Sequence, residues 1–273
     1  MYMRKTALFF APHPDDVEFG CSWYYMSLLE KRYRVIQVSM TDGAFGTKNP
    51  DFKGERIVKI RSNELDRANK VFEDAFNSKI EIIRLGYTDG YLPLSSSTRK
   101  RVMEIIQEYE PDIIFAPDPW YSQDYHPDHI NTGRIVIFAL KKLAPTLMTP
   151  IPVMLYYTFA PNRFITVKPK YLKVLPHAFL KHQSQISSFG VKLVMKMIKI
   201  LILGLNFLKF QKRVKGYRIQ EYNQKNEPIY PPHFEENSIL HQIKHHLFHL
   251  PDFTTFEKLH DRSPEEIGIE IKK

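Results

Sequence analysis

The sequence predicts an α/β fold: a Rossmann-like, mostly parallel sheet with helices on both faces and an active site at the carboxyl ends of the strands. Two observations carry this prediction. Short apolar segments alternate with segments of helical spacing between residues 6 and 142. Clusters of histidine and aspartate directly follow two of the apolar segments. At 273 residues and 43% hydrophobic content, the chain is long enough to bury a sizeable core.

The first three elements lie close together. Residues 6–12 (TALFFAP) form a short apolar run that is typical of a buried strand. The run is too short for the apolar core of a signal peptide, so we interpret it as a strand. Residues 21–33 are spaced as a helix with a basic end that complements the helix dipole. Residues 34–41 (RVIQVSMT) predict a second strand. This order is the start of a strand–helix–strand unit.

The alternation then continues. Residues 57–73 have helical spacing, residues 80–86 are strand-like, and residues 97–110 form a helix with a Ser or Thr cap. Residues 112–118 (DIIFAPD) predict a further apolar strand. Strands separated by helices pair in parallel and are covered on both faces, so their carboxyl ends share one edge of the sheet.

The first polar cluster follows the first strand. His13, Asp15 and Asp16 stand in APHPDDVEFG immediately after the apolar run. Taken alone, this motif could be a capped turn in which aspartate side chains bond backbone amides.

The second cluster follows the strand at residues 112–118. His126, Asp128 and His129 occupy HPDH, and Pro127 suits the first position of a helix that places His129 in its first turn. Because both clusters follow strands of one predicted sheet, we expect them to converge. Buried carboxylates are costly unless a cation lies beside them. Ligands of the types His, Asp and His, with water in the remaining position, are those that catalytic zinc uses.

These motifs resemble the PIG-L/LmbE-like family of zinc-dependent N-acetylglucosaminyl de-N-acetylases. The resemblance spans roughly residues 5–225, and HPDD followed by HPDH is its specific signal. The other matching pieces, in family order, are TDGAFG at 41–46, RSNELDRA at 61–68, LGYTDG at 85–90, PDIIFAPDP at 111–119 and KVLPHAFLKHQSQ at 173–185.

The resemblance implies roles for the clustered residues. It implies that His13, Asp16 and His129 bind Zn²⁺, that Asp15 is the general base, and that His126 stabilises the oxyanion or protonates the departing amine. Zinc chemistry permits these roles, and another divalent metal could substitute because ligand type restricts the metal only loosely. Asp128 is expected to orient one of the imidazoles.

The resemblance implies that Arg61 and Asp89 contact the sugar or the group attached to it. Each has an ordinary alternative. Arg61 has Glu64 and Asp66 nearby on a predicted helix, which would equally fit a surface ion pair. Asp89 is followed by glycine, a dipeptide that is also common in simple turns.

Charge and cysteine content bear on partners and location. The net charge of +9 either favours binding to acidic partners or reflects a positive surface that only solvent contacts. We expect no nucleic-acid partner. Cys21 is the only cysteine, which suits a reducing cytosol, so we expect a cytoplasmic protein, with membrane association left open. The chain has no Gly-rich phosphate loop and no serine nucleophile motif.

The domain prediction is a deacetylase domain over residues 1–225 and an extension over 226–273. A basic apolar insert at about 191–216 has no obvious counterpart in the family core. It predicts peripheral contact with anionic lipid through residues 191–210, or an internal or subunit-packing helix in a homo-oligomer. Histidines 241, 245, 246 and 249 in the extension fit packing or surface positions better than a metal site.

The expected function is therefore zinc-dependent hydrolysis of an acetyl group from an N-acetylglucosamine-containing substrate. Two alternatives remain open: a zinc amidase that acts on a non-sugar amide, and a non-catalytic protein that binds a membrane or a glycan through the same fold. A binding module has no need for a base and metal ligands together, so the two intact motifs favour an enzyme.

Overall fold

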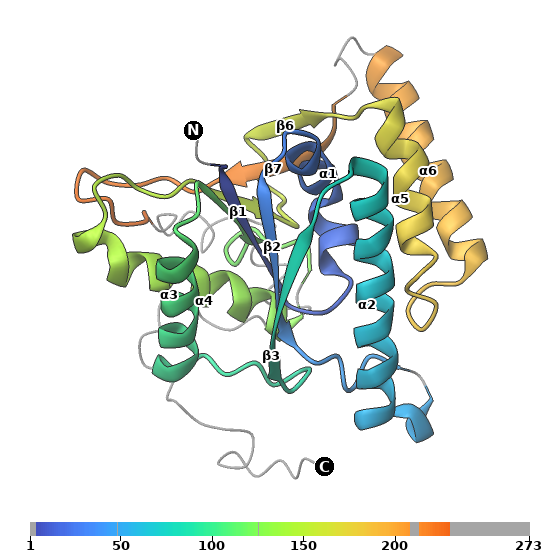
Figure 1. The fold of residues 1–273 in the computed structure, drawn as a ribbon. Helices are drawn as coiled ribbons and strands as arrows, with labels where there is room; N and C mark the ends of the chain where they lie inside the picture. Colours follow the sequence, from blue (N-terminus) through green and yellow to red (C-terminus); the bar gives the residue numbers. More distant parts are fainter. Residues whose placement is uncertain (1–3, 48, 125, 208–212, 230–273) are drawn as a thin grey trace, which may run out of the picture.

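The computed structural model describes residues 4–47, 49–124, 126–207 and 213–229. These residues form one seven-stranded sheet with helices on both sides (Figure 1). The strands are β1 (Thr6–Ala11), β2 (Arg34–Thr41), β3 (Ile80–Tyr87), β4 (Ile113–Pro117), β5 (Val153–Tyr156), β6 (Arg163–Thr166) and β7 (Arg213–Ile219).

The sheet is mostly parallel, which confirms the predicted α/β class. Its strand order is β3-β2-β1-β4-β5-β7-β6. The five strands from β3 to β5 pair in parallel, whereas β7 runs antiparallel to both β5 and β6. The order reverses at β1, because β2 and β4 lie on its two sides, and this is where ligands bind in open α/β sheets.

The helices divide into two layers. A single π-helical turn (Val17–Cys21) leads into the first helix. The longer helices are α1 (Ser22–Glu30), α2 (Glu55–Phe76), α3 (Ser96–Tyr109), α4 (Pro127–Leu143), α5 (Pro169–Phe179) and α6 (Ser188–Phe207). In Figure 1, α2, α5 and α6 lie on one side of the sheet and α3 and α4 on the other. Short 3₁₀ turns occupy Pro50–Phe52 and Ala144–Thr146.

Two cores flank the sheet because alternate residues of a strand face opposite sides. Phe9 of β1 packs into the core beneath α1, α2, α5 and α6, and its neighbours Leu8 and Phe10 pack into the core beneath α3 and α4. Every residue of β1 is buried, as the continuous apolar run predicts for a central parallel strand. The first cluster of polar residues therefore lies at the end of a strand in the middle of the sheet.

The predicted insert at about 191–216 belongs to two different elements of the structure. Its first part lies in α6, which packs against α5 and β7, and its last residues belong to β7, a strand of the sheet. Residues 208–210 and the histidine-rich stretch at 241–249 lie outside the described residues. The boundary at 225/226 stays a prediction. In the part of the chain that the structure describes, no helix is both long and apolar enough to cross a bilayer.

Candidate metal centre

The loop after β1 folds back on itself through Asp16. The Asp16 carboxylate accepts a hydrogen bond from the His13 backbone N–H at 2.8 Å, which closes the turn around Pro14 and Asp15. Both His13 and Asp16 are buried, at 8% and 5% exposure. The turn thus places two potential ligands three residues apart with their side chains facing each other.

The second motif is positioned by the start of α4. His126 is the N-cap residue, and its Nδ1 accepts a hydrogen bond from the backbone N–H of Asp128 at 3.3 Å. Pro127 occupies the first turn, as predicted. Gly133 lets the helix approach β4 closely, since a Cβ there would lie 2.4 Å from the Pro117 carbonyl oxygen. These features bring His129 to the carboxyl ends of the strands.

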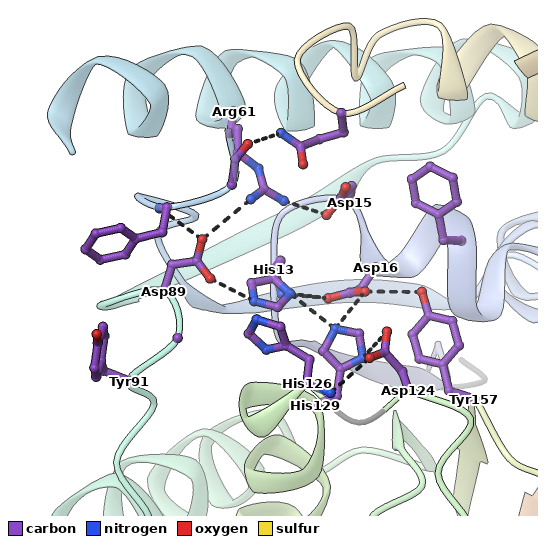
Figure 2. Close-up of a pocket in the computed structure, with 15 residues that line it drawn as sticks. His13, Asp15, Asp16, Arg61, Asp89, Tyr91, Asp124, His126, His129 and Tyr157 are labelled. Carbon is purple, nitrogen blue, oxygen red and sulfur yellow. Dashed lines mark hydrogen bonds and ion pairs between the residues drawn. The ribbon is translucent and has the colours of Figure 1, made fainter. Parts of the chain in front are cut away.

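Three side chains meet where the two motifs converge (Figure 2). His13 Nδ1 lies 3.1 Å from Asp16 Oδ2, His129 Nε2 lies 3.3 Å from Asp16 Oδ1, and the two imidazole nitrogens are 3.2 Å apart. All three residues are buried. Two imidazoles and one carboxylate with converging donor atoms fit a catalytic divalent metal such as zinc. The structure thus brings together the three residues predicted as ligands.

Carboxylates lie close to the outer nitrogens of both imidazoles. His13 Nε2 lies 3.0 Å from Asp89 Oδ1 and 3.3 Å from Asp128 Oδ2, and His129 Nδ1 lies 3.4 Å from Asp124 Oδ2. An imidazole that donates its outer N–H to a carboxylate presents the lone pair of its other nitrogen to the centre, as in metal sites generally. Asp128 thus lies beside His13, and orientation of that imidazole by Asp128 stays a prediction.

The electrostatics of the cluster favour a cation. Burial by itself would lower the pKa of His13, but hydrogen bonds to Asp128, Asp16 and Asp89 outweigh it and raise that pKa well above its usual value. Burial opposes ionisation of Asp16, yet His129 and His13 hold the pKa of its carboxyl well below the usual range. Without metal the centre thus retains protons on its imidazoles, and a divalent cation would replace them.

Asp15 points to a different partner from Asp16. Its Oδ1 accepts a hydrogen bond from Arg61 Nη2 at 2.7 Å (Figure 2). Arg61 is only 4% exposed, and the TDGAFG segment folds closely around its guanidinium. A Cβ at Gly43, where φ is +73°, or at Gly46 would lie 2.8 or 2.0 Å from Arg61 Nη1.

The alternative of a surface ion pair for Arg61 is wrong, because its two expected partners bond elsewhere. Glu64 accepts hydrogen bonds from the backbone N–H and hydroxyl of Ser184, and Asp66 pairs with Arg84. Arg61 instead faces the candidate metal centre from α2, 3.9 Å from Asp89 as well as beside Asp15.

Asp89 and Asp128 fix the loop after β3 as well as the imidazole of His13. Asp89 Oδ2 accepts from the Phe45 backbone N–H at 3.1 Å, and the two oxygens of Asp128 accept from the backbone N–H groups of Gly90 and Leu92 at 2.6 and 3.0 Å. Asp128 is fully buried. The turn interpretation of Asp89 also holds, since Gly90 has a φ of +81°. Both carboxylates thus contact other protein groups before any substrate arrives.

A pocket of about 710 Å³ opens over the centre, within the usual size range for small-ligand sites. Seven of the eight predicted site residues line it, and Asp128 lies behind His13. His126 also lines the pocket, with its ring edge-on to His13 at 4.7 Å between centroids. Burial, and then the nearby His13, lower the pKa of His126, which favours a neutral imidazole.

Eight further residues line the pocket and are missing from the sequence-based set, among them Tyr157, Asp124 and Gln185. The Tyr157 hydroxyl donates to Asp16 Oδ1 at 3.2 Å, and its ring stacks on His129. Its φ of +56° is unusual for a residue with a side chain. Tyr157 directly follows β5, so the rule that finds polar residues after strands would have found it had that strand been recognised.

Comparisons with known proteins find relatives that are named as deacetylases. The family model described as PIG-L, GlcNAc-PI de-N-acetylase, matches residues 8–140. Diacetylchitobiose deacetylase of Thermococcus kodakarensis is 28% identical over 195 residues, which are 66% of this chain and 70% of that protein. An uncharacterised deacetylase of Escherichia coli, YaiS, is 27% identical over 184 residues, 66% of this chain and 92% of that protein.

Solved structures show the same fold. The N,N'-diacetylchitobiose deacetylase of Pyrococcus horikoshii superposes with a TM-score of 0.68 at 27% identity and covers 79% of this chain and 83% of its own. A hydratase, GalB of Pseudomonas putida, superposes at 0.61 with 13% identity over 84% of this chain and 97% of its own, so this likeness concerns the fold alone. The family match covers every residue predicted for the site, and residues 8–140 therefore form a PIG-L family domain.

Proposed function

We propose that this chain is a metal-dependent N-deacetylase that hydrolyses the acetamido group of an N-acetylglucosamine-containing substrate. The observation that carries this proposal is a carboxylate, Asp15, beside a buried centre of two imidazoles and a second carboxylate. Relatives that are 28% and 27% identical are named as diacetylchitobiose deacetylases, which supports a substrate of this class.

Zinc is the metal that we assign to His13, Asp16 and His129, since their donor set is a common one in catalytic zinc sites. When bound, such an ion polarises the acetyl carbonyl and lowers the pKa of a bound water. The chain's own residues supply the remaining chemistry, namely proton transfer, charge stabilisation and orientation of the ligands.

Asp15 is the general base in this proposal. Arg61 holds its Oδ1, which leaves Oδ2 to accept a proton from the attacking water. As the oxygen–carbon bond forms and the carbon–nitrogen bond breaks, the same carboxyl delivers that proton to the leaving amine. Acetate and a free amino group are then the products, and atoms and charges balance without a further reactant.

His126 is the group that we assign to the developing oxyanion. Its Nδ1 accepts the Asp128 backbone N–H, so in the neutral ring the proton lies on Nε2, where it can be donated. A lowered pKa keeps the ring in this neutral form near pH 7. A positioned donor to an oxyanion is among the stronger catalytic devices in hydrolases.

The test combines metal analysis with product detection. We expect about one zinc per chain by elemental analysis, with acetate released from N-acetylglucosamine or N,N'-diacetylchitobiose, lost on chelation and restored by zinc. The double variant His13→Ala/His129→Ala should contain no stoichiometric metal, and retained metal there would refute the ligand assignment.

The substrate arms separate the alternatives. Acetate release only from N-acetylated amino acids would favour the non-sugar amidase, and metal binding without any acetate release would favour a binding protein. The expectations of a cytoplasmic location, of a homo-oligomer and of no nucleic-acid partner remain predictions.

A further inference from the structure

The outward face of α6 exposes a row of large apolar side chains. Phe189 is 75% exposed, Leu193 50%, Met197 63% and Ile200 59%. Their spacing of four, four and three residues places them on one face of the helix. They are four of the nine large hydrophobic residues that are exposed in the described part of the chain, so the exposure is concentrated on this helix.

The core does not need this row. Val191 and Met195, on the opposite face of α6, are buried, and Val194 and Ile198 pack partly against the same core. The helix is thus already anchored through one apolar face, and the outward row is a second one. Contiguous exposed apolar surface of this kind marks interaction sites on proteins.

Lysines flank the row along one edge. Lys192, Lys196 and Lys199 are exposed and lie one helical step before Leu193, Met197 and Ile200. The sequence of α6, Ser188–Phe207, contains these three lysines and no aspartate or glutamate. The face therefore combines apolar contact area with positive charge that no acidic residue of α6 itself compensates.

We propose that this face of α6 docks on a membrane surface that contains anionic lipid. The apolar row would insert among the acyl chains, and the lysines would contact the headgroups, the two attractions that hold interfacial helices. A second copy of the chain fits less well. A twofold contact in which the two α6 helices run antiparallel would bring two rows of lysines together without an acidic partner in either helix.

The docking face starts close to the pocket. Gln185 lines the pocket, and its side chain donates to the Gly46 carbonyl at 2.6 Å. Phe189 is four residues further along the chain, which sets their separation at no more than about 14 Å. A bilayer that holds the Phe189 end of α6 would thus lie near the side of the pocket that Gln185 lines.

Co-sedimentation of the full chain with lipid vesicles tests this proposal. We compare vesicles of phosphatidylcholine alone with vesicles of phosphatidylcholine mixed with phosphatidylglycerol. Wild-type protein should bind the anionic vesicles about tenfold or more tightly than the neutral ones, and binding should fall with added salt. The variant Lys192→Gln/Leu193→Gln/Lys196→Gln/Met197→Gln should lose most of this binding.

A matched pair of double variants controls for charge and hydrophobicity. Lys196→Gln/Met197→Gln removes one lysine and one exposed methionine from α6. Lys142→Gln/Met148→Gln removes the same two types at and beyond the end of α4, where Met148 is 99% exposed. Only the α6 variant should weaken binding, while thermal melting and acetate release from a soluble substrate remain unchanged in both.

Several results would overturn the proposal. An equal loss of vesicle binding in both double variants would show that binding depends on the overall charge and hydrophobicity of the protein and not on α6. Vesicle binding that is unchanged in the fourfold variant would exclude α6 as the docking face. A wild-type dimer that the fourfold variant dissociates in sedimentation velocity, without any change in lipid binding, would identify a second copy as the occupant.

Discussion

The neighbouring residues Asp15 and Asp16 have different surroundings because the turn after β1 points their side chains in different directions. Asp16 faces two imidazoles and a tyrosine hydroxyl inside the cluster, whereas Asp15 faces Arg61 across the pocket. A carboxylate that binds the ion cannot also accept a proton from the attacking water efficiently. In the function that we propose, the pair divides ligand and base between adjacent positions, and this division is open to direct measurement.

Asp15→Asn should retain zinc and the fold but lose roughly 10² to 10⁴ in kcat, the usual contribution of a positioned general base. Asparagine has the shape of aspartate and can still accept a hydrogen bond from Arg61, but it cannot take up the proton. Asp16→Asn should instead weaken zinc affinity first. Zinc titrations and acetate-release assays on both variants check the roles, which are reversed if Asp15→Asn is the one that loses metal.

Residues within the motifs could be predicted from the sequence, but contacts between distant segments could not. His13, Asp16 and His129 were found because each follows a recognisable strand or starts a helix. The burial of Arg61 depends on Gly43 and Gly46, which lie on a different loop, and its helix position alone fitted a surface ion pair as well as a substrate contact. Spacing along one element cannot reveal which loop folds over it.

At the scale of elements, the long periodic segments were predicted best. The helix predicted at 57–73 is Glu55–Phe76, and the helix predicted from Pro127 starts there. The strands β5, β6 and β7 were not recognised because β5 and β6 have four residues each, and β7 pairs with partners far away in sequence. Short strands have little periodicity, and Tyr157 was missed for that reason.

The segment between α5 and α6 is held by buried polar contacts. His182 Nε2 lies 3.2 Å from Glu18 Oε1 in the π-helical turn, and both side chains are almost completely buried. Ser184 donates to Glu64 of α2. These contacts hold Gln185 at the pocket, so the family-like KHQSQ sequence has a structural role here.

This buried pair should make stability depend on pH. Burial raises the pKa of Glu18, although His182 opposes it. Burial would lower the pKa of His182, but Glu18 outweighs it and raises that value. Both groups therefore bind protons more tightly in the folded chain than in the unfolded chain. Their contribution to the free energy of unfolding is full at low pH and declines as pH rises, above about 4.5 for Glu18 and 6.5 for His182.

Urea unfolding at several pH values measures this effect. The double variant Glu18→Gln/His182→Gln lacks both titrating groups, so the difference in stability between wild type and variant should shrink as pH rises from 5 to 8.5. Both proteins keep the same candidate ligands, and pH effects from the metal centre cancel in the comparison. Parallel pH profiles would show that the pair does not titrate in this range.

At the scale of the whole molecule, the candidate metal centre joins parts that are far apart in sequence. His13 and Asp16 follow β1, and His129 belongs to α4. The carboxylates behind the imidazoles come from the loops after β3 and β4 and from the first turn of α4. The sheet order brings these ends together because β1 lies between β2 and β4. A bound ion would therefore link the two halves of the sheet edge.

Removal of the ion should lower the thermal stability of the whole domain. A ligand present at 100 times its Kd stabilises the folded state by about 2.7 kcal/mol, and each kcal/mol shifts the Tm of a domain of this size by roughly 2–4 °C. Chelation should therefore lower the Tm by about 5–10 °C, and added zinc should restore it. Thermal melts followed by circular dichroism measure this shift.

The variant His13→Ala/His129→Ala is the control, since it has lost two of the three candidate ligands and its Tm should not respond to chelator. A variant that responds as strongly as wild type would show that chelator acts elsewhere in the chain, and that the folded domain does not depend on metal at this centre.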